Sequence, residues 1–225
     1  MRKGVLHLKK SDPLMRAIIE RVGPCRMEFS EPTFHSLAEA IVYQQLNGKA
    51  AATIFNRFTA LAGDPVTPKG ILKLSNQQLR KVGLSKQKSS YLFDMAERAQ
   101  RGELDFSRLG GMTDDEVIEH LTQVKGVGVW TAHMFLMFTL QRANVLPTGD
   151  FGIRMAMHKY YLDRAAKKKN GADKTGTKKT AVKSPKIKIT LPTPEQMGKI
   201  AKRWEPYRSI ACWYLWRSLD TKTIG

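Results

Sequence analysis

Apolar residues recur three or four positions apart along almost the whole chain, which is the spacing of one face of an α-helix. Helix-start signals precede several of these segments: Asp12 stands before Pro13, and Thr113 is followed three residues later by Glu116 in a capping-box pattern. Alternation typical of a strand occurs only at residues 186–190 and is weak. The pattern therefore predicts an all-α protein of about ten helices.

The composition of the chain excludes several classes of protein. The 225 residues include 38 Lys and Arg against 20 Asp and Glu, which gives a net charge of +18, and 42% are hydrophobic, enough for a core. No apolar run is long enough to cross a bilayer, and no apolar signal core opens the chain. Neither Cys25 and Cys212 nor the five histidines have metal-ligand spacing. We expect an intracellular protein without a membrane segment, whose partner is nucleic acid.

Half of the net charge lies in one segment. Residues 164–188 hold nine Lys and one Arg against one Asp, and large apolar residues are almost absent. Such a composition predicts a disordered insertion, placed at residues 165–188, which can still add affinity for phosphate groups.

Residues 121–132 read Leu-Thr-Gln-Val-Lys-Gly-Val-Gly-Val-Trp-Thr-Ala. One predicted helix ends here, the chain turns through Gly126 and Gly128, and a second helix begins. Backbone amides at the start of that second helix can bind a phosphate. By itself the pattern also fits a tight connection between two helices.

Three further segments accompany this turn: residues 146–154 (Leu-Pro-Thr-Gly-Asp-Phe-Gly-Ile-Arg), 40–51 (Ala-Ile-Val-Tyr-Gln-Gln-Leu-Asn-Gly-Lys-Ala-Ala) and 204–216 (Trp-Glu-Pro-Tyr-Arg-Ser-Ile-Ala-Cys-Trp-Tyr-Leu-Trp). Together, and in the order in which they follow one another along the chain, the four segments resemble the helix-hairpin-helix (HhH-GPD) DNA glycosylases, and within them the AlkA and Mag-type 3-methyladenine DNA glycosylases. The resemblance runs from about residue 32 to 219, interrupted by the Lys-rich insertion.

The resemblance implies one HhH-GPD domain, residues 1–225, with two helical subdomains around a DNA-binding cleft. The central subdomain would span about 36–140 and hold the hairpin at 121–132. The second subdomain would combine 1–35 with 141–225.

The resemblance also implies a reaction. Asp150 would be the catalytic carboxylate, although an aspartate before a helix can equally be its N-cap. Relatives that also cut the strand place a lysine where this chain has Trp130. The expected activity is therefore that of a monofunctional glycosylase, which flips an alkylated purine out of duplex DNA, hydrolyses its N-glycosidic bond and leaves an abasic site.

The remaining site residues follow from the same resemblance. Aromatic residues expected to line the base pocket are Trp130, Tyr207, Tyr43 and Phe151, with Trp204 and Trp213 as further candidates; packing in the core is the alternative for each. Residues expected at DNA are Gly126, Gly128, Thr131, Lys125, Lys86 and Gln87, the last two as candidates for a wedge that fills the gap left by the flipped base. The backbone carbonyls of Thr122, Val124 and Val127 would hold a structural Na⁺ or K⁺, and no cofactor is expected for catalysis.

The expected partner is double-stranded DNA with alkylated bases, bound by a monomer. Three alternatives stay open on the sequence. The chain could be a non-catalytic DNA-binding module that uses only the hairpin, a glycosylase for deaminated or mismatched bases, or a Lys-rich protein associated with RNA or the ribosome.

Overall fold

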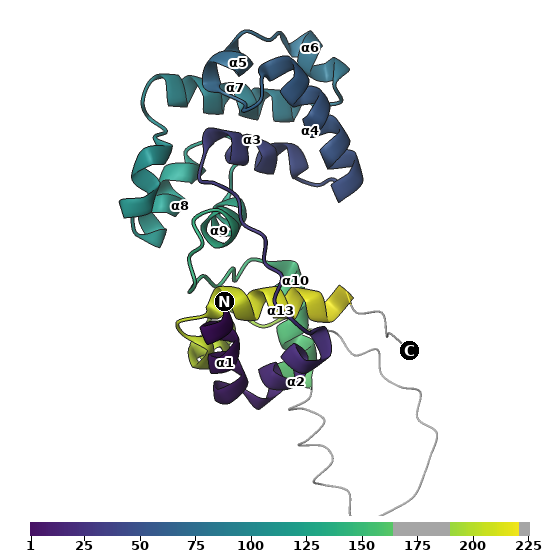
Figure 1. Ribbon diagram of the computed structural model, residues 1–225, viewed down its shortest axis with the longest axis vertical. Helices are drawn as coiled ribbons and strands as arrows, with labels where there is room; N and C mark the ends of the chain where they lie inside the picture. Colours follow the sequence, from purple (N-terminus) through teal and green to yellow (C-terminus); the bar gives the residue numbers. More distant parts are fainter. Residues whose placement is uncertain (164–189, 221–225) are drawn as a thin grey trace, which may run out of the picture. The chain divides into compact units, whose positions relative to one another are not determined.

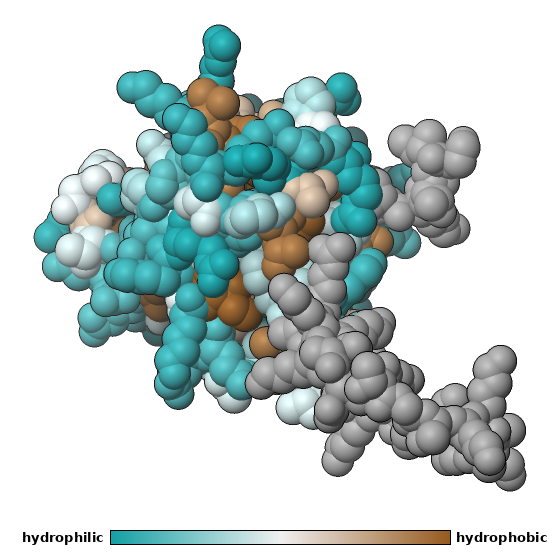
Figure 2. All heavy atoms as spheres, turned by 90° about the horizontal axis from the view of Figure 1, so that it is seen from below, coloured by the Kyte–Doolittle hydropathy of each residue, from teal (hydrophilic) through white to brown (hydrophobic). Residues whose placement is uncertain are grey.

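The computed structural model describes residues 1–163 and 190–220. This part of the chain is mainly helical and contains no β-strand, which confirms the all-α class (Figure 1). None of its helices is both long and apolar enough to span a membrane. The Lys-rich segment predicted at 165–188 and most of the strand-like pattern at 186–190 lie outside the described residues. The face drawn in Figure 2 is mainly hydrophilic, with small separate hydrophobic patches.

The chain divides into two compact units. The central unit is Glu28–Arg142, and the terminal unit combines Met1–Met27 with Ala143–Gly225. The central unit thus begins earlier than the residue 36 expected from the sequence. Two hydrogen bonds explain the difference: the Ser30 N–H donates to the Phe138 carbonyl at 3.0 Å, and the Ser30 and Thr139 hydroxyls are 3.1 Å apart. Both tie this early segment to the end of a central helix.

Helix α7 lies in the middle of the central unit, and α3, α5 and α6 pack against it. Its apolar face buries Leu92 and Met95 completely, together with Leu37 of α3 and Phe58 of α4. The elements of this unit are α3 (Phe34–Tyr43), α4 (Gly48–Ala62), α5 (Pro68–Leu72), α6 (Asn76–Lys81), α7 (Lys86–Gln100), η1 (Phe106–Gly111), α8 (Asp114–Thr122) and α9 (Val129–Phe138).

Helix α13 is the most enclosed element of the terminal unit. Seven successive residues from Ser209 to Leu215 are buried, and α2 and α10 pack against this helix. A helix that is covered all round cannot show a one-sided apolar pattern. The elements here are α1 (Arg2–Ser11), α2 (Pro13–Val22), α10 (Phe151–Met157), η2 (His158–Leu162), α12 (Pro194–Ala201), η3 (Lys202–Trp204) and α13 (Arg208–Asp220).

The capping signals predict helix starts well. Ser75, Thr113 and Thr193 each form the full reciprocal capping box, and the Asp12 side chain caps α2. The sequence pattern misses α1, α5 and η1, which are short or carry few large apolar residues. The last helix, α13, begins at Arg208, and α10 continues into a π-helical turn, η2.

Asp12 joins three elements of the terminal unit, α2, η2 and η3, through one buried carboxylate. Its Oδ1 accepts from the backbone amides of Leu14 and Met15 at 2.9 and 3.2 Å. Its Oδ2 accepts from the Tyr161 hydroxyl and from the Trp204 indole N–H, both at 2.9 Å. Burial, followed by the charge of Asp12, raises the pKa of Tyr161, so this phenol stays protonated and keeps donating.

We predict that Asp12→Ala destabilises the protein by about 3 kcal/mol or more, because it removes a helix cap and leaves the buried Trp204 indole and the part-buried Tyr161 hydroxyl without their acceptor. Chemical denaturation followed by circular dichroism measures this change. Glu20→Ala is the matched control, since Glu20 is an exposed acid on the adjoining α2 and its substitution should change stability by less than about 1 kcal/mol. Equal effects of the two substitutions would contradict the role given to Asp12.

Candidate functional site

The Gly-Val-Gly turn connects α8 to α9, as the sequence predicts. Helix α8 ends at Thr122, and Gly128 is the N-cap of α9. The Val127 N–H donates to the Val124 carbonyl at 3.0 Å, which closes the turn between the two helices. The structure therefore contains the helix-hairpin-helix arrangement within the central unit.

The two glycines of the turn have different reasons to be glycine. Gly126 has a φ of +79°, and a Cβ at this position would lie 2.1 Å from the Tyr91 ring. Gly128 has an ordinary φ of −92°, and a Cβ there would meet nothing within 4 Å. The first glycine is needed by the protein's own packing, whereas the second leaves open space in front of the first amides of α9.

A cavity of about 590 Å³ adjoins this hairpin inside the central unit. Tyr43 and Trp130, both predicted for the base pocket, lie on its wall, and Trp130 is 48% exposed. Burial, and then the charge of Glu39, raises the pKa of Tyr43, so its ring stays a neutral phenol. The residues that line the cavity are Ala40, Tyr43, Gln44, Gln45, Leu46, Gly126, Trp130, Thr131 and Met134.

Gln44 links this cavity to the hairpin, a role that its place in the sequence does not reveal. Its side-chain amide donates to the Gly126 carbonyl at 2.9 Å and to the Thr131 hydroxyl at 3.4 Å. Thr131 is buried and also lines the cavity, so Gln44 ties a residue of the cavity wall to the hairpin turn. The next residue, Gln45, is exposed and has a φ of +58°, which is unusual outside glycine.

The other residues expected at DNA lie at the surface of the central unit. Lys86 and Gln87 are exposed in the first turn of α7, where the Gln87 amide donates to the Tyr91 hydroxyl at 2.5 Å. The Lys125 side chain is 69% exposed. The carbonyls of Thr122, Val124 and Val127 belong to the end of α8 and to the turn itself.

Asp150 lies in the terminal unit and is the N-cap of α10. It is only 7% exposed. Its Oδ1 accepts from the Ile153 N–H at 2.7 Å and from the Trp216 indole N–H at 2.8 Å. Capping thus coexists with a second hydrogen bond, from α13, and the two donors together set the orientation of the carboxylate.

Trp216 reaches Asp150 because Gly152 has no side chain. A Cβ on Gly152 would lie 3.0 Å from the Trp216 ring and 3.3 Å from Asp150 Oδ1. Trp216 belongs to the motif at residues 204–216, but nothing in the sequence assigns it a role. The contact joins residues 66 positions apart, so a periodicity argument could not have found it.

Cys212 lies one turn before Trp216 on α13 and is buried. Burial, and then the negative charge of Asp150, raises the pKa of the Cys212 thiol well above its usual range. This cysteine therefore stays protonated at neutral pH and adds no second charge beside the carboxylate.

The remaining aromatic candidates differ in how far their side chains are exposed to solvent. Trp204 and Trp213 are buried among the helices of the terminal unit, which favours the packing alternative for both. Phe151, beside Asp150, is 68% exposed. Tyr207 is partly exposed, and its ring lies 5.4 Å from that of His7, with Gly4 of α1 against it.

Comparison with known proteins agrees with these features. The model of the HhH-GPD superfamily base excision DNA repair proteins matches residues 38–181. DNA-3-methyladenine glycosylase 1 of Schizosaccharomyces pombe is 32% identical over 223 residues, which cover 96% of this chain and 86% of that protein.

Solved structures agree as well. The structure of the S. pombe 3-methyladenine DNA glycosylase Mag1 in complex with abasic DNA aligns with this chain at a TM-score of 0.75 and 31% identity. The alignment covers 98% of this chain and 98% of that chain. The DNA-3-methyladenine glycosidase of Bacillus halodurans has a TM-score of 0.74 and 32% identity, covering 97% of this chain and 89% of that chain. The family suggested by the four motifs is thus confirmed: this chain belongs to the HhH-GPD superfamily of base excision DNA repair proteins.

Proposed function

We propose that this chain is a monofunctional DNA glycosylase that removes alkylated purines of the 3-methyladenine and 7-methylguanine type from duplex DNA. The observation that carries the proposal is the buried Asp150 carboxylate, oriented by the Ile153 amide and the Trp216 indole. It occurs in a chain whose relatives, about 30% identical over most of its length, are named 3-methyladenine DNA glycosylases.

Asp150 suits the chemistry of this reaction. An alkylated purine carries a positive charge, and it leaves as a neutral base when it takes the electron pair of the bond to C1′. The sugar then becomes cationic. A carboxylate with a fixed orientation stabilises that developing charge and can accept the proton of the attacking water, which leaves an abasic site.

The aromatic wall of the central cavity suits a cationic base. The faces of Tyr43 and Trp130 are electron-rich, and a positive ring stacked on them gains cation–π attraction in addition to apolar contact. We propose Tyr207 and Phe151 as further aromatic surfaces for the flipped nucleotide. Trp130 also replaces the lysine of strand-cutting relatives, and an indole cannot form a Schiff base, which supports the monofunctional assignment.

The hairpin suits the phosphate backbone of DNA. Gly128 carries no side chain that could cover the amides of Gly126, Gly128 and Trp130, and the net charge of +18 adds attraction for a polyanion. Duplex DNA is thus the proposed partner, bound by a monomer, with Lys86 or Gln87 as the proposed wedge.

A monovalent cation fits the same turn. Thr122 is the last residue of α8, so the helix supplies no donor four residues ahead for its carbonyl. The Val124 carbonyl accepts one hydrogen bond, from Val127, and a carbonyl oxygen has two lone pairs. We propose that these oxygens and that of Val127 would hold Na⁺ or K⁺, which would add positive charge beside the bound phosphate.

Asp150→Asn should lower release of 3-methyladenine from methylated duplex DNA by about 100-fold or more, because the charge is lost. Binding should stay within about threefold, because the asparagine can still cap α10. Single-turnover base release and fluorescence anisotropy measure the two quantities. Full activity of the variant would overturn the catalytic assignment. If neither protein released a base while both bound DNA, a non-catalytic binding module, or a glycosylase for other lesions, would replace the proposal.

Trp216→Phe should lower the single-turnover rate at saturating DNA by about 10-fold, because an aromatic ring remains while the donor to Asp150 is lost. Trp213→Phe is the matched control on the same helix: it changes buried packing and should lower the melting temperature without a comparable loss of rate. Unchanged chemistry in Trp216→Phe would show that the Ile153 amide alone suffices.

The two hairpin glycines should respond differently to alanine. Gly126→Ala should destabilise the central unit by about 1–3 kcal/mol, because a Cβ meets the Tyr91 ring and the positive φ is strained. Gly128→Ala should leave the melting temperature nearly unchanged but weaken duplex binding several-fold, because the Cβ occupies the space expected for a phosphate. Tight binding by Gly128→Ala would argue against a phosphate at this place.

A further inference from the structure

One side of α7 contacts both segments that line the central cavity. Lys88 donates through Nζ to the carbonyls of Val42 and Gln44 at 2.6 and 2.7 Å, at the end of α3. Tyr91, almost one turn later, packs against Gly126 of the hairpin. Asp94, three residues further, reaches Lys125 of the same turn. These three side chains follow one another along α7 with the spacing of a single helix face.

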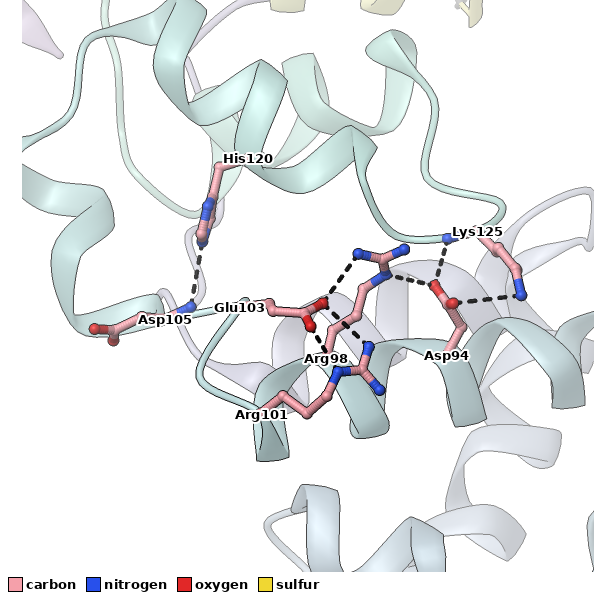
Figure 3. Close-up of polar contacts among 7 residues, drawn as sticks. All are labelled: Asp94, Arg98, Arg101, Glu103, Asp105, His120 and Lys125. Carbon is pink, nitrogen blue, oxygen red and sulfur yellow. Dashed lines mark hydrogen bonds and ion pairs between the residues drawn. The ribbon is translucent and has the colours of Figure 1, made fainter.

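Asp94 makes the most direct contact with the hairpin (Figure 3). Its Oδ2 accepts from the backbone N–H of Lys125 at 2.9 Å and from Arg98 Nε at 3.1 Å, and its Oδ1 lies 3.5 Å from Lys125 Nζ. Burial raises the pKa of Asp94, but these hydrogen bonds and charges outweigh burial and lower it, so the carboxylate is ionised at neutral pH.

A second acid supports this arrangement without touching the hairpin. Glu103 accepts from Arg98 Nη1 at 3.2 Å and from Arg101 Nε at 2.6 Å. Arg98 is thus held between Asp94 and Glu103 (Figure 3). The two acids belong to one charged network, yet only Asp94 contacts the backbone of the turn among the contacts described here.

We propose that Asp94 is a positioning residue for DNA binding: by holding the Lys125 amide, it keeps the hairpin turn in the conformation that presents the following amides to a phosphate. Asp94 holds the N–H of Lys125, and Gln44 holds the carbonyl of Gly126, the next residue. The two contacts therefore fix the turn just before and just after the peptide bond that joins these residues. The inference rests on the proposed function, since it assumes that the hairpin binds DNA.

The loss of the Asp94 charge and the loss of its hydrogen bond to Lys125 should change the affinity for DNA in opposite directions. Removing a negative charge beside Lys125 should strengthen the attraction for a polyanion. Releasing the Lys125 amide should weaken binding, because the phosphate-binding amides then have to be ordered on contact with DNA. A loss of affinity on removal of Asp94 therefore cannot come from charge alone.

The experiment compares Asp94→Ala with Asp94→Asn, two neutral variants of which only the second retains an acceptor for the Lys125 amide. Binding to a duplex with an abasic-site analogue is measured by fluorescence anisotropy at two salt concentrations. Single-turnover base release is measured at saturating DNA, and thermal melting checks that each variant is folded. Glu103→Gln is the matched control, because it removes one negative charge from the same network and leaves the hairpin contact in place.

We expect about 10-fold weaker binding by Asp94→Ala, with Asp94→Asn and Glu103→Gln within about threefold of the wild type and all rates at saturation preserved. Binding by Asp94→Ala as tight as the wild type, or tighter, would overturn the proposal. So would equal losses in both Asp94 variants together with a slower rate at saturation, which would indicate a general structural defect. Failure of the proposed function is separate, because the wild type itself would then show no base release.

Discussion

A carboxylate removed from water must find hydrogen-bond donors, and this requirement organises both units of the chain. In residues 1–163 and 190–220 the buried charged side chains are those of Asp12, Asp94 and Asp150. Each accepts from at least one backbone amide and at least one side chain, and each has at least one of these donors in another segment of the chain. Asp12 joins the helices of the terminal unit, Asp94 contacts the hairpin turn, and two donors orient Asp150. The same physical device thus serves stability and, in the roles proposed for Asp94 and Asp150, DNA binding and catalysis.

Missing side chains are as important as the buried charges. Gly126 admits the Tyr91 ring under the hairpin, and Gly152 admits the Trp216 ring to Asp150. In both cases a Cβ would occupy the space of an aromatic ring, so glycine and aromatic residue depend on each other. Gly128 differs, because the space before it is open within this chain. This contrast separates a glycine needed for folding from one available to a ligand, although both belong to one short motif.

Local signals in the sequence predicted a large part of the fold. The capping boxes at Ser75, Thr113 and Thr193 mark helix starts because they involve only residues three positions apart. For the candidate site, the sequence identified some of the aromatic residues at the cavity but did not distinguish them from aromatic residues of the core. Tyr43 and Trp130 do line one cavity, whereas Trp204 and Trp213 are core residues with the same type of side chain. An aromatic residue suits either environment, and its neighbours in space decide between them.

The sequence alone determined the helical class, the position of the hairpin, the cap at Asp150 and, through the four motifs, the family. Each of these depends on residues close together along the chain or on the order of short segments. The folded structure was needed to show that Trp216 donates to Asp150, that Gln44 and Asp94 contact the hairpin, and that Gly126 must admit Tyr91. Those contacts join residues 31 to 82 positions apart, and their existence depends on how whole helices pack, which no local spacing rule records.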